Sequence, residues 1–221
     1  SGQRKGINPH TDLGANSFND LDKIHNLEIG NFDIKFGKYS KDGFMFLAKN
    51  GTVMDVAKSS TVKDIGSVTT SFSDGLNGST TTETEASTGT VIAYSEGVWD
   101  GNVHGISSST LQGKETEINI YAPLTMVSKE GIAYFGNRKG IVNVGDNTNQ
   151  VNTKAIGYGS IIGYGKDLGT VNINGTITAD DLGVSTKANK YTNIGAYAKD
   201  GGKVIVEKTT TINGLGAIAD G

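Results

Sequence analysis

The sequence predicts an all-β protein, a right-handed parallel β-helix (a solenoid) with loop excursions, and three observations lead to that prediction. The 221-residue chain holds 32 Gly but only 2 Pro, and its apolar fraction is 35%. Short runs of Val and Ile alternate with polar residues, which is typical of half-buried strands. A strand–turn–strand motif also recurs along the chain, as expected for stacked structural repeats.

The repeat is clearest in two segments that align on Gly169 and Gly202, with Tyr164 matching Tyr197. A third copy places Gly140 at the same position. The copies are, in chain order, FLAKNGTVMDV (46–56), GIAYFGNRKGIVNVG (131–145), IIGYGKDLGTVNI (161–173), IGAYAKDGGKVIV (194–206) and GAIADG (216–221), of which the first is the faintest. Alternating apolar residues in each copy predict ladders of inward-facing Val, Ile and Leu.

Asn-Gly and Asp-Gly pairs supply the turns between these strands, because Gly adopts positive φ without steric cost. The same pairs favour two-residue hairpins, so an antiparallel β-sandwich is the alternative fold. The repeat favours the β-helix, since a sandwich has no reason to reuse one motif.

We divide the chain into an atypical N-terminal part or cap (1–88) and a β-helical repeat region (89–221), within one continuous domain. In the first part, NSFNDLDKIHNL (16–27) predicts a short helix and LEIGNFDIKFGKY (27–39) a strand. The segment TTSFSDGLNGSTTTETEAST (69–88) predicts a polar loop, or a Thr-rich edge strand that leaves the stack. Because GAIADG stops within a copy of the repeat, we expect a fragment of a longer protein.

Composition excludes several functions. A formal net charge of −3 offers no basic footprint for nucleic acid. The absence of Cys excludes disulfides and thiolate zinc sites. The three His form no metal motif, and no G-x-S-x-G nucleophile elbow occurs. Asp180 and Asp181 are adjacent carboxylates, but adjacent strand residues face opposite sides. We therefore predict that the chain is not an enzyme and binds no cofactor or metal.

The segment EGVWDGNVHG (96–105) is the best candidate for ligand binding. It contains Trp99, the single Trp of the chain, with Asp100, Asn102 and His104 between glycines. An exposed ring beside amide and carboxylate groups suits a sugar or a protein partner. The alternative is that Trp99 fills a layer of the core and that the polar residues form an ordinary turn.

Two further sets of side chains are expected to line up between rounds. Arg138, Lys139, Lys166 and Lys199 lie at or near equivalent turns and would form a basic ridge, which could bind an acidic ligand or simply be a solvated corner. Four tyrosines could form an aromatic ladder that stabilises the stack, namely Tyr134, Tyr158, Tyr164 and Tyr197.

The segment IGYGKDLGTVNINGTI (162–177) and its copy at 194–206, in a composition rich in Lys, Asn, Ile, Thr and Asp, resemble the passenger of a bacterial type V autotransporter, in particular the large outer-membrane adhesins of fusobacteria. The resemblance covers 89–221 well and 1–88 weakly. It implies a bacterial cell-surface location (outer membrane, extracellular passenger), with the membrane reached only through a C-terminal barrel that this chain does not contain.

The resemblance further implies attachment to host cells or to partner bacteria through a host receptor or a glycan. We expect a monomeric adhesin fragment that binds through its loops or one flank of the solenoid. Two alternatives stay open. The first is a purely structural β-helical stalk, and the second is a polysaccharide-active enzyme.

Overall fold

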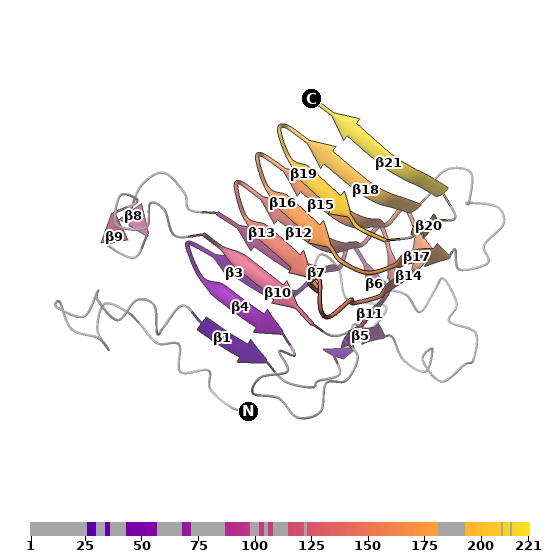
Figure 1. The fold of residues 1–221 in the computed structure, drawn as a ribbon, viewed down its shortest axis with the longest axis horizontal. Coiled ribbons are helices and arrows are strands. Elements are labelled where there is room, and N and C mark those ends of the chain that lie inside the picture. The colour runs from indigo at the N-terminus through magenta and orange to yellow at the C-terminus, as the bar shows by residue number, and fades with distance from the viewer. Residues whose placement is uncertain are drawn as a thin grey trace.

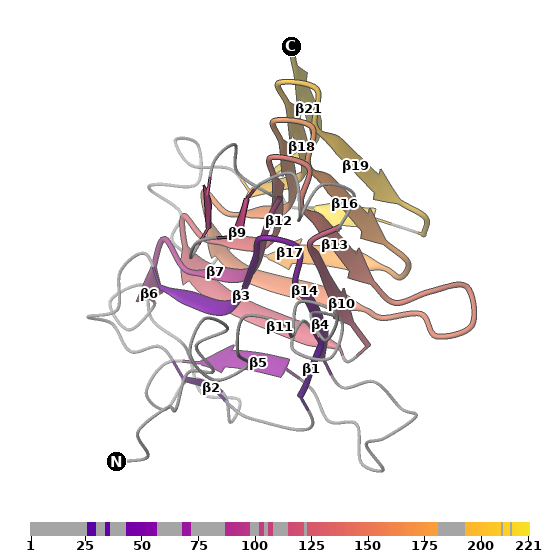
Figure 2. The ribbon, with the colours of Figure 1, turned by 90° about the vertical axis from the view of Figure 1, so that its left-hand side faces the viewer.

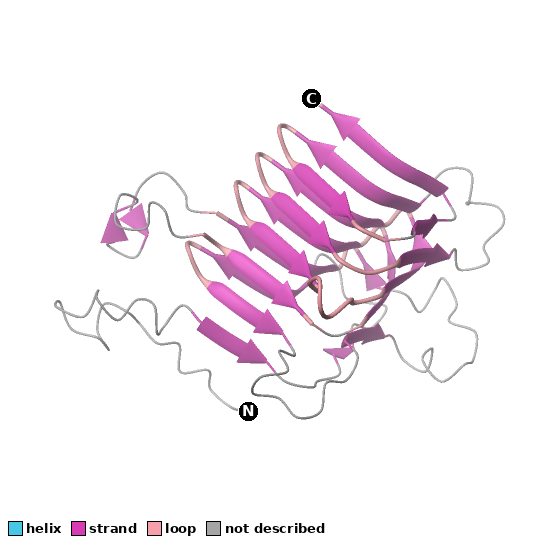
Figure 3. Ribbon diagram, in the orientation of Figure 1, coloured by secondary structure: helices cyan, strands magenta, loops and turns pink. Residues whose placement is uncertain are grey.

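The structure, a computed structural model, describes residues 26–29, 34–35, 43–56, 68–71, 87–97, 102–103, 106–107, 115–121, 123–180, 193–208, 210–212 and 214–221. All regular structure in these ranges is β, and Figure 3 shows strands joined by loops. No helix in the described part of the chain could therefore span a membrane.

Three sheets run side by side along the molecule (Figures 1 and 2). The first contains, in spatial order, β1 (Asn26–Ile29), β4 (Val53–Val56), β10 (Glu117–Ile120), β13 (Ile141–Val144), β16 (Thr170–Ile173) and β19 (Lys203–Val206). The second contains β2 (Ile34–Lys35), β5 (Val68–Ser71), β11 (Leu124–Lys129), β14 (Thr153–Tyr158), β17 (Ile177–Asp180) and β20 (Thr210–Ile212), and β6 (Ser87–Thr88) also pairs with β11.

The third sheet contains β3 (Phe44–Lys49), β7 (Val91–Glu96), β12 (Ile132–Asn137), β15 (Ile161–Lys166), β18 (Asn193–Lys199) and β21 (Gly214–Asp220). The chain visits the three sheets in turn, for example β10, β11, β12 and then β13, β14, β15. We call each such set of three strands a round. Strands pair in parallel with their equivalents in the neighbouring rounds. This all-β, parallel arrangement is compatible with the predicted β-helix.

The strand register reproduces the alignment of the repeat. Val171 pairs with both Val142 and Val204, and Tyr164 pairs with Tyr197. Even the shortest copy is in register, because Ala196 pairs with Ala217. The sequence repeat therefore records which residues lie above one another in successive rounds.

Two described pairs, Asn50-Gly51 and Asp200-Gly201, form corners and do not form hairpins between paired strands. Asn50 and Gly51 both have positive φ (58° and 81°), as do Asp200 and Gly201 (50° and 75°), which is the pattern of a type I′ turn. The strands on either side of each turn belong to different sheets and pair only with other rounds. This parallel pairing excludes the antiparallel β-sandwich for the three sheets, because each such turn leads the chain into the next sheet.

Inward-facing side chains of the three sheets meet in one core. Buried apolar residues alternate along β10, β13 and β16 with outward residues, which are polar except for Ile141, as the period-two pattern predicts. The largest fully buried side chains are Val56, Ile92, Ile118, Ile120, Leu124, Met126, Tyr134, Ile162, Ile173 and Ile177.

The helix predicted at 16–27 lies almost wholly outside the described ranges and stays a prediction; Leu27, which it shares with the strand predicted at 27–39, lies in β1 and pairs with Met54. Two other predictions for residues 27–88 need correction. The strand predicted at 27–39 is two strands, β1 and β2, in different sheets. The Thr-rich segment 69–88 is described only at its two ends, where β5 pairs with both β2 and β11 and β6 pairs with β11, so these ends lie within the stack; residues 72–86 lie outside the described ranges.

Glycines after the corner turns let backbones of successive rounds approach closely. A Cβ added at Gly169 would lie 2.1 Å from the carbonyl oxygen of Gly136, and one at Gly202 would lie 2.1 Å from that of Gly165. Both glycines are equivalent to Gly140 in the repeat, so this contact recurs from round to round.

Gly169→Ala should therefore destabilise the protein by about 3 kcal/mol, because rigid backbone surrounds the new methyl group. Gly216→Ala is the matched control, since nothing lies within 4 Å of its added Cβ. Urea denaturation would measure both changes. Equal stabilities of the two variants would contradict the role given to the corner glycines.

Candidate functional site

One corner of the stack carries an insertion in place of a short turn. Between the third and first sheets, the other rounds have only residues 50–52, 138–140, 167–169 and 200–202. Between β7 and β10 the chain instead runs through 97–116 and forms the antiparallel hairpin β8 (Asn102–Val103) and β9 (Ile106–Ser107). Figure 1 shows this hairpin beside the stacked sheets.

Buried hydrogen bonds hold both ends of the insertion together. The Ser95 hydroxyl donates to the carbonyl of Thr116 (2.9 Å) and accepts from the N–H of Ile141 (3.1 Å). The Thr116 hydroxyl in turn accepts from the N–H of Gly51 (2.7 Å). Since Ser95 and Thr116 are buried, the insertion leaves and rejoins the stack at a fixed point.

A charged cluster lies beside the same point. The Glu96 side chain is only 3% exposed, and its carboxylate lies 2.9 Å from Lys49 Nζ and 3.8 Å from Arg138 Nη1. These partners come from the rounds before and after β7, so the cluster ties three rounds together across the insertion. Tyr94 accepts a hydrogen bond from Asn137 (2.9 Å) in the same cluster, and burial raises the pKa of Tyr94.

The predicted ligand-binding residues belong to this insertion. Asn102 lies in β8, where it pairs with Ser107. Trp99, Asp100 and His104 lie outside the described residues, so both interpretations of Trp99 remain predictions. No motif in the sequence marks 97–116 as an insertion. The signal in the sequence is that the two-residue turn expected directly after Glu96 is missing.

The structure places the residues of the basic ridge on neighbouring corners. Lys166 and Lys199 are paired in register, and Arg138 and Lys139 form the preceding corner turn. Carboxylates lie beside both lysines. Lys166 Nζ lies 3.9 Å from Asp167. Lys199 Nζ lies 3.1 Å from Asp220, which raises the pKa of Lys199 and lowers that of Asp220. Each lysine of this edge therefore has an acidic neighbour.

An aromatic column runs along the outer face of the third sheet. Ring centroids are 4.5 Å apart between Phe135 and Tyr164, and 5.0 Å apart between Tyr164 and Tyr197, with nearly parallel planes. Tyr94 contacts Phe135 at 5.0 Å with its ring tilted by 75°, and Phe44 contacts Tyr94 at 5.2 Å with a tilt of 55°. Because the three parallel rings cover one another's faces, this part of the column stabilises the stack and offers little flat ring surface to a sugar.

The predicted tyrosine ladder is thus half right. Tyr164 and Tyr197 stack, but Tyr134 faces the core, fully buried, and its hydroxyl lies 2.6 Å from that of Thr153. Its place in the column is taken by Phe135, which pairs with Tyr164. Tyr158 lies in β14, in another sheet. The alignment of Gly140 with Gly169 in the sequence already matches Phe135, and not Tyr134, with Tyr164.

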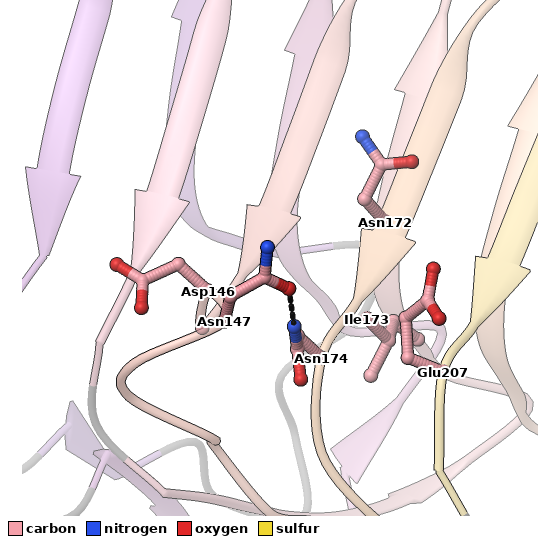
Figure 4. A pocket seen from close by; sticks show the side chains of 7 residues that line it. Asp146, Asn147, Asn172, Ile173, Asn174 and Glu207 are labelled. Carbon is pink, nitrogen blue, oxygen red and sulfur yellow. Dashed lines mark hydrogen bonds between the residues drawn. The ribbon is translucent and has the colours of Figure 1, made fainter.

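An open hollow of about 210 Å³ lies at another corner, between the first and second sheets. Residues of the connection after β13 line it on one side, and residues of the two following rounds line the other (Figure 4). Its lining is Gly145, Asp146, Asn147, Asn172, Ile173, Asn174 and Glu207. In the part of the chain that the structure describes, no three His, Asp or Glu side chains are grouped to hold a metal ion.

Comparison of the chain with protein-family models, with curated proteins and with solved structures found no match.

Corner turn 167–168 carries a strained residue. Leu168 has φ of 65° and is 57% exposed, at a position where two equivalent turns have Gly51 and Gly201 and a third has Lys139 with φ of 67°. Leu168→Gly should raise the free energy of unfolding by about 0.5–1 kcal/mol, because relief of the left-handed strain exceeds the entropy cost of Gly. Leu168→Val should lower it, since a β-branched residue fits positive φ worst. Thermal unfolding of both variants would show the two signs; a loss in both would contradict this account.

Burial raises the pKa of Tyr134 well above its ordinary value. Above pH about 10 the unfolded chain loses this proton while the folded protein keeps it, so stability should fall as pH rises, by up to about 1.4 kcal/mol per pH unit. Tyr134→Phe should remove this part of the slope, measured by urea denaturation at stepped alkaline pH. An unchanged slope would refute the assignment.

At neutral pH, Tyr134→Phe should instead cost about 1–3 kcal/mol, because it leaves the buried Thr153 hydroxyl without this partner. The double variant Tyr134→Phe/Thr153→Val should recover most of that loss.

Proposed function

We propose that this chain is part of a bacterial cell-surface autotransporter adhesin, a right-handed parallel β-helix that binds a host receptor or a glycan through the insertion at 97–116. The observation that carries the proposal is the insertion itself. Among the equivalent described corners, only this one has a long segment in place of a three-residue turn, and buried hydrogen bonds fix both ends of that segment. A loop on a rigid support is a common arrangement for recognition.

Several features of the insertion and its support fit this role. The stack needs no inserted residues to close this corner, because the neighbouring rounds close it with three. The ion pairs of Glu96 with Lys49 and Arg138 connect three rounds at the corner where the insertion replaces a turn. The insertion also contains the single Trp and the Asp, Asn and His expected to contact a ligand.

A structural stalk is the second candidate, and one observation favours it. Ion pairs neutralise the charges of Lys166 and Lys199 at the corner edge. The rings of the aromatic column are stacked on one another. Two surfaces that could have attracted a ligand therefore stabilise the stack instead. The two functions differ in one respect: an adhesin binds saturably through the insertion, whereas a stalk binds nothing.

The decisive variant replaces residues 97–115 by Asn-Gly and keeps Thr116. Its corner then matches Lys49-Asn50-Gly51-Thr52, a turn that the fold already uses. We expect circular dichroism and thermal unfolding close to those of the unaltered chain, with saturable binding to cultured host cells and to a glycan array lost. Trp99→Ala should reduce this binding, and Trp99→Phe, which keeps a ring, should retain more of it.

Undiminished binding by the shortened variant would move the site away from the insertion. A folded, unaltered chain that binds neither cells nor glycans would overturn the adhesin proposal in favour of the stalk.

A further inference from the structure

We propose that the hollow lined by Asn147, Asn172, Asn174 and Glu207 is a binding site for one uncharged sugar residue. The site is separate from the insertion and lies at the corner between the first and second sheets. Figure 4 shows the side chains of Asn147, Asn172 and Glu207 around the hollow, with Asn174 below them. This inference rests on the proposed function only for the choice of carbohydrates as probes.

The wall formed by the connection after β13 is held in one conformation. Asp146 Oδ1 accepts three hydrogen bonds, from the hydroxyl and N–H of Thr148 (both 2.8 Å) and from the N–H of Asn149 (2.7 Å), which keep the pKa of Asp146 below its usual value. Asn174 Nδ2 donates to Asn147 Oδ1 (3.0 Å) and ties this wall to the next round. The wall is therefore preorganised, which lowers the entropy lost on binding.

A ladder of side-chain amides ends at the opposite wall. Asn119 donates to Asp55 (3.0 Å), Asn143 donates to Asn119 (2.8 Å) and Asn172 donates to Asn143 (2.8 Å). Because the carboxylate of Asp55 only accepts, every amide in the ladder points its oxygen toward the next round. The next position is Ile205, which pairs with Asn172 but has no donor to offer. The ladder therefore leaves the Asn172 oxygen without a ladder donor, at the hollow.

The lining selects the class of ligand. Amides present both N–H donors and oxygen acceptors, and Glu207 adds acceptors, which suits the hydroxyl groups of a sugar because each hydroxyl both donates and accepts. No cationic side chain lines the hollow, while Asp146 and Glu207 are acidic, so anionic sugars are disfavoured. A volume of about 210 Å³ admits a single ring, smaller than the usual drug-sized pocket.

The test is a titration of the isotope-labelled chain, followed through the side-chain amide signals of Asn147 and Asn172 by NMR. The probes are the methyl glycosides of glucose, galactose, mannose and N-acetylglucosamine, with N-acetylneuraminic acid as the anionic probe and calcium chloride as the cation probe. We expect at least one neutral glycoside to shift both signals saturably, and neither other probe to do so.

Asn172→Leu should weaken that binding about tenfold, as expected for a lost hydrogen bond to ligand. Asn137→Leu is the matched control, because it removes a hydrogen-bonded amide, the donor to Tyr94, that lies outside both the ladder and the hollow. We expect it to retain binding while losing at least as much stability. Equal weakening by both variants, shifts produced by calcium alone, or no response to any neutral glycoside would each overturn the proposal.

The shortened-corner variant separates this inference from the proposed function. It lacks the insertion but retains the hollow, so it should still bind the glycoside while no longer binding host cells. Loss of cell binding therefore says nothing against the sugar site, and failure of the NMR titration says nothing against the insertion.

Discussion

In-register parallel pairing between successive rounds is the constraint on which the rest of this structure depends. It sets each side chain directly above its equivalent, at the spacing between neighbouring strands. The chain must then place like on like: Val142 under Val171 under Val204 inside, and glycine at Gly140, Gly169 and Gly202 where backbones nearly touch. A residue that breaks this rule disturbs two neighbouring rounds at once.

The same constraint explains the outer surface. Amides in register become a hydrogen-bonded ladder, aromatic rings in register become a stacked column, and charged residues in register form ion pairs along an edge. Side chains that would suggest a binding surface in an ordinary domain are here largely satisfied by one another. Places where the register is interrupted are accordingly the more informative ones: the insertion after Glu96, and the end of the amide ladder at Ile205.

Hydrogen bonds from neighbouring residues hold the chain in place at both interruptions. Ser95 and Thr116 satisfy buried backbone groups at the base of the insertion, and Asp146 organises the connection beside the hollow. The two proposed sites therefore share one design, in which a regular stack supplies rigidity and a local departure from it supplies recognition. Leu168 is a third departure, a strained and exposed residue whose side chain lies over Gly201 of the next round, where an added Cβ would be 2.7 Å from Leu168 Cδ2.

The sequence alone determined the fold class, the parallel stacking and most of the register, because alternation and repetition are properties of the chain itself. It also located the corner turns and the segment 96–105. Only the tertiary structure decided which neighbour each residue meets: that Asn-Gly turns join different sheets, that Leu27 pairs with Met54, and that Phe135 and not Tyr134 joins the aromatic column. The clasp between Ser95 and Thr116 and the hollow at Asn172 likewise join residues distant in sequence. No local pattern encodes such contacts, since they arise only when separate rounds are stacked.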